Sequence, residues 1–184
     1  MAISDKKAAC RAEGIAARGR APVGAQEAAA GHLSSVLAGH RGVPLAGYMA
    51  MRGEVDPQPA MEEASAYGPV GVPVIEQKAA PLKFRSWEPG CPLVRGTFGA
   101  MIPQDGTWIV PQIVIVPLVA WDARGGRLGY GGGFYDRTLE ALRVQGAVMA
   151  VGFAFAAQEV AEVPIEETDQ PLDLMVTDAG VIRF

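Results

Sequence analysis

Residues 112–137 read QIVIVPLVAWDARGGRLGYGGGFYDR, and this stretch decides the fold class. Its first part, 112–122, is apolar, as expected of a central parallel strand that is covered on both faces. The last part, 127–137, holds four glycines between a basic and an acidic residue. Glycines gather in this way where a backbone turns through positive φ or approaches a ligand closely. The stretch therefore predicts a buried strand that leads into a glycine-rich turn.

The segments around this stretch alternate between helical and strand patterns. Helices are predicted at 4–18, with Ser4 as the N-cap and Asp5 in the first turn, and at 25–37, 56–68 and 134–146. Strands are predicted at 43–51, 69–75, 81–87, 147–155 and twice within 173–184, whereas 88–106 is rich in turn residues. Strands that alternate with helices predict an α/β domain with a central, largely parallel sheet.

Composition limits the class of protein. At 184 residues the chain is long enough to bury a core as one domain, and its net charge of −4 argues against a nucleic-acid binder. Cys10 and Cys91 are far apart without CxxC spacing, which suits a reducing compartment and predicts neither a disulfide framework nor a zinc site. The sequence has no run of about 20 apolar residues and no signal-peptide core at its charged N-terminus. We expect a soluble, cytoplasmic monomer without membrane partners.

The glycine-rich turn has two interpretations. It follows the carboxyl end of a strand and precedes a helix, which is where ligands bind in open α/β sheets. Backbone N–H groups in such a turn suit phosphate, and Arg127 adds a positive charge. A flexible hairpin is the alternative, since neither GxxxxGK[ST] nor GxGxxG fits the sequence. Asp136 either complements the helix dipole or holds Mg²⁺ against nucleotide phosphates, and spacing leaves both readings open.

Four blocks together resemble the 5-formyltetrahydrofolate cyclo-ligase family, also called methenyltetrahydrofolate synthetases. The blocks are EVD at 54–56, PLKFRSW at 81–87, VPLVAWDARGGRLGYGGGFYDR at 116–137 and PIEETDQPLD at 164–173. They occur in the family's order through nearly the whole chain. The resemblance implies a single compact three-layer α/β/α domain over residues 1–184. It also implies conversion of 5-formyltetrahydrofolate to 5,10-methenyltetrahydrofolate, with Mg²⁺ and with hydrolysis of ATP to ADP and phosphate.

The implied chemistry sets the tasks of the protein. A formamide carbon is a poor electrophile, because its nitrogen donates into the carbonyl group. Transfer of the γ-phosphoryl group to the formyl oxygen creates a leaving group, and N10 of the folate then closes the ring. The protein has to position the reactants and stabilise charge, as in phosphoryl transfer generally.

The resemblance assigns ATP to two parts of the chain. The family's K-x-x-L-R motif corresponds to Lys7-Ala8-Ala9-Cys10-Arg11, with Cys10 in place of leucine, a modest loss of volume that should not prevent the helix from docking. Lys7 and Arg11 are four residues apart and share a helix face; read alone, they are a solvated basic face. The other expected ATP ligands are Arg127, Gly129, Tyr130, Gly131, Gly132, Gly133, Phe134 and Tyr135.

The remaining roles also come from the resemblance. It implies that Asp136 and Asp169 bind Mg²⁺. It implies a folate pocket lined by Met49, Glu54, Phe98 and Tyr135, in which the carboxylate of Glu54 accepts N–H bonds from the pterin. Tyr135 and Arg127 are the expected catalytic residues.

Two departures limit what the resemblance implies: the first removes a hydroxyl role, and the second affects the pocket wall. Phe134 replaces a common tyrosine, and Ile102 replaces an acidic residue. Read alone, Met49 is core filler, Glu54 a surface charge and Asp169 a turn residue. The competing hypothesis is a relative that binds a nucleotide or sugar phosphate for regulation, and the joint retention of the basic and acidic set argues against it.

Overall fold

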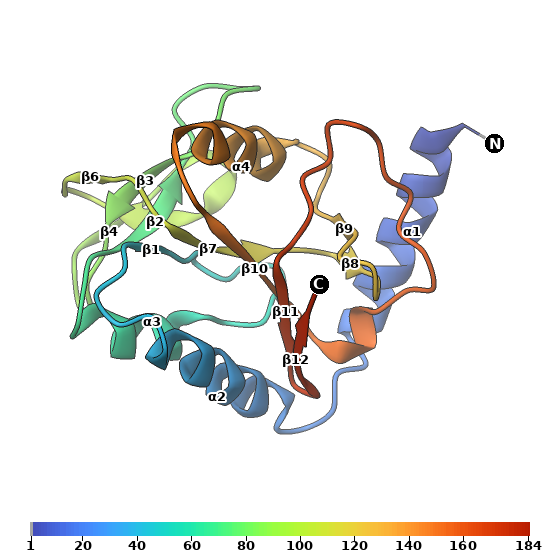
Figure 1. Cartoon of the computed structure of the whole chain (residues 1–184), viewed down its shortest axis with the longest axis horizontal. Coiled ribbons are helices and arrows are strands. Elements are labelled where there is room, and N and C mark those ends of the chain that lie inside the picture. The colour runs from blue at the N-terminus through green and yellow to red at the C-terminus, as the bar shows by residue number, and fades with distance from the viewer. Residues whose placement is uncertain (1) are drawn as a thin grey trace.

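The computed structural model describes residues 2–184, and its centre is an eight-stranded mixed sheet (Figure 1). The strand order is β12-β11-β10-β7-β1-β2-β3-β6. The strands from β11 to β2 in this order run parallel, and β12 and β3 pair with them antiparallel. The bounds are β1 Leu45–Ala46, β2 Val70–Val74, β3 Lys83–Ser86, β6 Trp108–Ile109, β7 Ile113–Pro117, β10 Met149–Phe153, β11 Leu174–Thr177 and β12 Gly180–Arg183. The predicted α/β class and largely parallel sheet are confirmed.

Helices cover both faces of this sheet. They are α1 Ile3–Arg18, α2 Ala25–Ala38, α3 Gln58–Ser65 and α4 Phe134–Gln145, with short 3₁₀ turns η1 Thr97–Gly99 and η2 Ala156–Gln158. Ile115 of β7 packs with Leu33 of α2 and Met61 of α3, whereas the next side chain back, Val114, packs with Leu139 of α4. Successive strand side chains point to opposite faces, so β7 joins two apolar layers. Figure 1 shows α4 on one side of the sheet and α2 and α3 on the other, which confirms the three-layer arrangement.

The helix α1 stands at the carboxyl end of the sheet, beside the hairpin of β8 Ala120–Trp121 and β9 Arg127–Leu128 (Figure 1). A Cβ atom on Gly14 would overlap the carbonyl oxygen of Val119, so the close approach requires glycine at this position. Cys10 is buried against Ala120 and Leu128, and the expectation that it permits docking is confirmed. This contact fixes the face of α1 that carries the predicted basic residues.

Three local expectations are wrong. Ser4 is not the N-cap: α1 begins at Ile3, because the carbonyl oxygen of Ala2 already accepts from the N–H groups of Asp5 and Lys6. The strand expected at 43–51 is only the two-residue β1. The strand expected at 112–122 ends at Pro117, because the N–H group of Val119 bonds to the carbonyl of Leu128 and starts the β8–β9 hairpin.

The turn-rich segment 88–106 also contains regular structure. β4 Leu93–Arg95 and β5 Met101–Pro103 pair as an antiparallel hairpin, with η1 between them. Within residues 2–184, no helix combines the length and apolarity that a membrane span needs.

Candidate active site

The glycine-rich loop, residues 129–133, connects β9 to α4. Gly131 and Gly133 have φ values of 95° and 64°, in the left-handed region that side chains disfavour. Gly133 is the N-cap residue of α4, and in the described part of the chain no side chain caps this end of the helix. The first N–H groups of a helix lack partners within the helix and carry partial positive charge, so this end suits an anion.

Two arginine side chains contact the glycine-rich loop, one from α1 and one from α4. Arg11 Nε donates to the carbonyl oxygen of Gly129 at 2.8 Å, and a Cβ on Gly131 would come within 3.3 Å of Arg11 Nη2. Arg137 Nη2 donates to the carbonyl of Gly132 at 2.6 Å. Sequence reasoning placed Arg11 at this loop and overlooked Arg137, which directly follows the recognised Asp136.

Lys7 is buried and joins α1 to the segment 164–173. Its Nζ donates to Glu166 Oε2 at 2.8 Å and to Asp169 Oδ2 at 2.6 Å. Burial by itself lowers the pKa of Lys7, but the hydrogen bonds and charges of the two carboxylates outweigh it and raise the pKa above the usual 10.5. Lys7 therefore remains charged, and it lies beside a predicted metal ligand.

Asp136 occupies the first turn of α4 and has two partners. Arg127 Nη2 donates to Asp136 Oδ1 at 2.6 Å, with Arg127 buried, and the N–H group of Gln170 donates to the same oxygen at 2.9 Å. Gln170 follows Asp169 in the chain, so the two predicted metal ligands belong to adjoining segments.

The donor set fits Mg²⁺ in one specific way. Within the described residues 2–184, no group of three or more His, Cys, Asp or Glu side chains could hold a metal by itself. Mg²⁺ usually takes one or two carboxylates and completes its shell with phosphate oxygens and water. Asp136 and Asp169 are consistent with a site of this kind and not with a metal cage made of protein alone.

Glu54 lies in the loop that follows β1 and is half-buried. Its Oε2 accepts from the N–H group of Met51 at 3.0 Å. Burial raises the pKa of Glu54, and the Met51 amide, Arg18, Tyr130 and Arg52 oppose this shift without cancelling it. The carboxylate thus lies in a partly desolvated position surrounded by donors.

The hydroxyl of Tyr135 is buried and has no hydrogen-bond partner among residues 2–184. Burial raises its pKa far above the usual 10; the charge of Glu54 acts in the same direction, and Arg127 opposes it. The hydroxyl is therefore a neutral donor within the electrostatic reach of both residues. A buried donor without a partner is rare in a folded protein, and it marks a position where a ligand can accept.

The structure brings some of the other predicted residues to this region. Phe98 is 58% exposed, and its ring lies edge-on to that of Phe134, with 6.3 Å between centroids. Met49 is partly buried against the core cluster of α2 and α3, as the core-filler interpretation expects. Its contact with folate stays a prediction.

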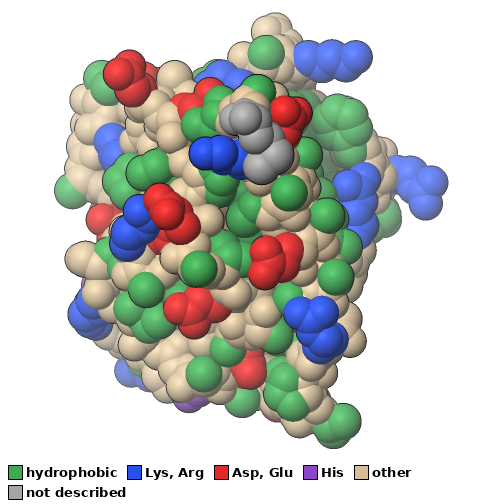
Figure 2. All heavy atoms as spheres, turned by 90° about the vertical axis from the view of Figure 1, so that its right-hand side faces the viewer, with side chains coloured by type: hydrophobic (Ala, Val, Ile, Leu, Met, Phe, Trp, Pro, Cys, Tyr) green, Lys and Arg blue, Asp and Glu red, His purple; other side chains and the backbone are tan. Residues whose placement is uncertain are grey.

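Arg18, in the last turn of α1, was missed. Its Nη1 donates to Tyr130 Oη at 2.8 Å and to the carbonyl of Arg52 at 3.0 Å, and its Nη2 donates to the carbonyl of Leu118 at 3.1 Å. The spacing of positions 7, 11 and 18 is a helical stripe that could have revealed it. Figure 2 faces this end of the molecule and shows basic and acidic side chains interspersed.

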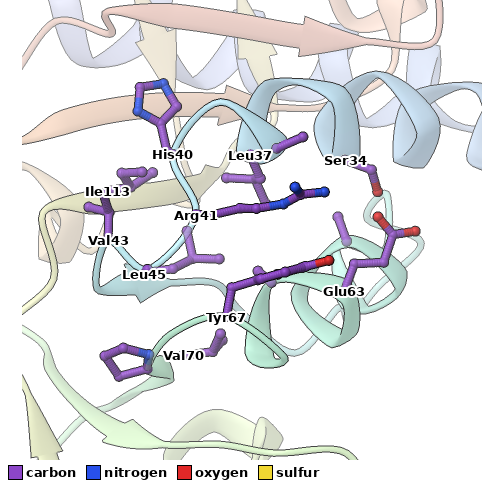
Figure 3. A pocket seen from close by; sticks show the side chains of 15 residues that line it. Ser34, Leu37, His40, Arg41, Val43, Leu45, Glu63, Tyr67, Val70 and Ile113 are labelled. Carbon is purple, nitrogen blue, oxygen red and sulfur yellow. The ribbon is translucent and has the colours of Figure 1, made fainter.

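Two cavities lie elsewhere. The pocket in Figure 3 has a volume of about 50 Å³ and lies between α2 and α3, near the amino ends of β1, β2 and β7, with Arg41 stacked 4.4 Å over the ring of Tyr67. A groove of about 320 Å³ separates α4 from β3 and β6. Neither cavity includes a predicted site residue.

A model of the 5-formyltetrahydrofolate cyclo-ligase family matches residues 4–178. The chain belongs to this family. It is 37% identical to the 5-formyltetrahydrofolate cyclo-ligase of Escherichia coli K12 over 141 residues, 73% of this chain and 77% of that protein. It is 31% identical to that of Haemophilus influenzae over 163 residues, 83% and 85% of the two chains. The predicted family and enzyme class are confirmed.

Solved structures agree with this membership. The 5,10-methenyltetrahydrofolate synthetase of Aquifex aeolicus superposes with a TM-score of 0.77 at 27% identity, over 96% of this chain and 92% of that one. The synthetase of Mycoplasma pneumoniae shares the fold, with a TM-score of 0.71 at 20% identity over 94% and 98% of the two chains. The family match and the cyclo-ligase relatives support cyclo-ligase activity.

Proposed function

We propose that the protein converts 5-formyltetrahydrofolate to 5,10-methenyltetrahydrofolate, consuming ATP and requiring Mg²⁺, as a monomer in which residues 1–184 form one domain. The observation that carries the proposal is the unpartnered buried hydroxyl of Tyr135. This hydroxyl belongs to the residue that precedes Asp136, just beyond the glycine-rich loop, and its pKa is influenced by the charges of Glu54 and Arg127. In the proposed reaction, the Tyr135 hydroxyl therefore lies where the phosphate site meets the folate site.

The nucleotide phosphates bind at the glycine loop. The uncapped N-terminus of α4 supplies N–H groups, while Lys7, Arg11 and Arg127 supply positive charge. Gly129, Tyr130, Gly131, Gly132, Gly133 and Phe134 complete the binding loop.

Asp136 and Asp169 hold Mg²⁺, which when bound neutralises charge on the phosphates. Both carboxylates are paired with cations in the present structure, Asp136 with Arg127 and Asp169 with Lys7. Lys7 also pairs with Glu166, so two cationic side chains face three carboxylates in these contacts. The cationic side chains are attracted to phosphate oxygens and the carboxylates to Mg²⁺, so the cluster can accept an anion and a cation together.

The folate binds on the side of Glu54. An ionised carboxylate matches the paired N–H donors at the edge of a pterin ring. The donors around Glu54 favour its ionised form against the effect of burial. Met49 and Phe98 provide apolar surface for the ring system.

Catalysis then rests on two side chains. Tyr135 keeps its proton because its pKa is raised, so it acts as a hydrogen-bond donor to the formyl group and not as a base. Arg127 stabilises the charge on the transferring phosphoryl group. The formyl oxygen takes the γ-phosphoryl group from ATP, and ADP leaves. N10 then attacks the formyl carbon and gives up its proton, and the bond from that carbon to the phosphorylated oxygen breaks, which closes the ring and releases phosphate.

The experiment that tests the activity is direct. Purified protein is incubated with 5-formyltetrahydrofolate, ATP and Mg²⁺, and the absorbance band of the methenyl product is followed. Appearance of the band only when all three are present supports the proposal. Nucleotide binding without product supports the alternative, a regulatory nucleotide-binding protein.

A further inference from the structure

Arg18 contacts three segments, and the proposed function assigns two of them to different ligands. Its guanidinium group is buried, with 7% of the residue exposed. It donates to Tyr130 in the glycine loop, to the carbonyl of Arg52 in the loop that carries Glu54, and to the carbonyl of Leu118 after β7. A buried arginine at such a junction fixes the relative position of the segments, because its planar fork can reach several acceptors at once.

The carbonyl of Arg52 that accepts from Arg18 lies in a strained part of the backbone. Arg52 and Gly53 have φ values of 54° and 73°, two successive residues in the left-handed region. A residue other than glycine persists in this conformation only where its surroundings hold it. Arg18 donates to the carbonyl between these two residues, and its Cδ lies beside Gly53. Arg18 thus supports the backbone conformation of the loop that presents Glu54.

The Tyr130 contact holds an exposed side chain. Tyr130 is 42% exposed, so packing alone does not fix its ring. The guanidinium carbons of Arg18 and Arg52 lie 5.8 Å and 5.1 Å from the ring centroid, and the Tyr130 hydroxyl accepts from Arg18. Cation–π contacts and the hydrogen bond together keep this part of the glycine loop against the loop of Glu54.

The electrostatic surroundings agree with this role. Arg18 donates only to carbonyl and hydroxyl oxygens, and its buried Nε has no partner among the described residues. The groups that influence the pKa of Glu54 are Arg18 from α1, Tyr130 from the glycine loop, and Arg52 and the Met51 amide from its own loop. The charge of Glu54 in turn raises the pKa of Tyr48 and of Tyr135.

We propose that Arg18 is a positioning residue for both ligands, holding the nucleotide loop and the Glu54 loop in the one arrangement to which folate and nucleotide bind. This inference rests on the proposed function. It predicts that the planar guanidinium group of Arg18 is needed as well as its charge, because a lysine side chain cannot reach three acceptors in separate segments.

The test uses calorimetric binding of 5-formyltetrahydrofolate, and separately of a non-hydrolysable ATP analogue with Mg²⁺, to the full chain. The variants are R18K, R18M and Y130F, and the matched control is R20K, which changes an exposed arginine just beyond the same helix. R18K should weaken both ligands about tenfold or more, as loss of hydrogen bonds from a charged group does. Y130F should weaken folate about threefold or more at an unchanged melting temperature, and R20K should match the wild type.

The pH dependence separates positioning from general loss of structure. R18M removes the cation near Glu54, so the midpoint of folate affinity against pH should move upward, whereas R18K should keep the wild-type midpoint. If R18K binds both ligands with wild-type affinity, the inference is overturned. Wild-type folate affinity in Y130F overturns it as well. The Y130F variant tests the contact between Arg18 and Tyr130 even if the Arg18 variants do not fold. If the wild type binds no folate, the proposed function fails first.

Discussion

Lys7 Nζ lies 2.6 Å from the carboxylate of Asp169, although 162 positions separate the two residues in the chain. The contact places a proposed phosphate ligand directly beside a proposed metal ligand. It also joins α1 to the segment 164–173, so the same ion pair contributes to stability and to the proposed site.

Replacement of Lys7 tests both contributions. K7M should raise the KM for ATP about tenfold or more, since a charge-assisted contact to phosphate is lost. It should lower the free energy of unfolding by about 1–3 kcal/mol, because Asp169 and Glu166 lose their buried partner. The control is K6M, which removes an exposed neighbouring lysine. Steady-state kinetics and urea denaturation measure the two effects, and a wild-type KM for ATP in K7M would contradict the assignment.

Asp136 is expected to serve the metal and not the folate. D136N should lower magnesium-dependent turnover about 100-fold or more, because transition-state charge on the phosphoryl group is no longer neutralised through this carboxylate. Folate affinity should change less than about threefold. E140Q, an exposed change one turn further along α4, is the control. Equal losses of turnover and of folate affinity in D136N would argue against this division of roles, and addition of EDTA to the wild type should abolish turnover.

Tyr135 should show opposite effects on activity and stability. Y135F removes a buried hydroxyl that has no partner within the described residues, so the free energy of unfolding should stay constant or rise by up to about 1 kcal/mol. Turnover should fall about tenfold or more, because the donor to the formyl group is lost. Y67F, at an exposed tyrosine at the other end of the sheet, is the control. A Y135F protein that is less stable and fully active would mean that the hydroxyl is structural.

Glu54 should give the fold and the folate site opposite pH dependences. Its folded-state pKa lies above the ordinary value of 4.5, so the folded protein holds its proton more tightly than the unfolded chain does. Stability from this group is therefore present below pH 4.5 and is lost as the pH rises through the folded-state pKa. Folate affinity should instead increase over the same interval, as the carboxylate becomes ionised.

The E54Q variant separates these effects. At neutral pH it should be at least as stable as the wild type, with the difference disappearing at pH values below 4.5. Its folate affinity should be about tenfold or more weaker and should lack the rise with pH. Denaturation and calorimetry across this interval are the measurements. A parallel rise in folate affinity with pH in E54Q would show that another group is responsible.

The sequence predicted those parts of the fold in which local pattern and tertiary packing agree. The apolar run before the glycines forms β7, and the helix after them is α4. The strand was predicted to extend beyond Pro117, but at Val119 a long-range hydrogen bond to Leu128 redirects the chain. Local pattern carries no information about such a partner, which also explains why the β4–β5 hairpin was read only as a turn-rich segment.

Site residues could be predicted where a family motif contains them. They were harder to predict where only a tertiary contact brings a residue to the site. Lys7 and Arg11 were expected from their motif. Arg18 shares their helix face, but its partners at Arg52 and Tyr130 are tertiary contacts that no local pattern predicts. Gly14 shows the same limit. By propensity it weakens a helix, whereas in the structure it permits the contact with Val119 that brings α1 to the site.

The central claim is that the amides of residues 129–133 and the neighbouring cations hold a triphosphate beside the folate pocket. A crystal structure with Mg²⁺ and a non-hydrolysable ATP analogue tests it most directly. We predict phosphate oxygens at about 3 Å from these N–H groups, with Mg²⁺ bound by Asp136 and Asp169. A triphosphate bound elsewhere, with the glycine loop free of ligand, would contradict the account.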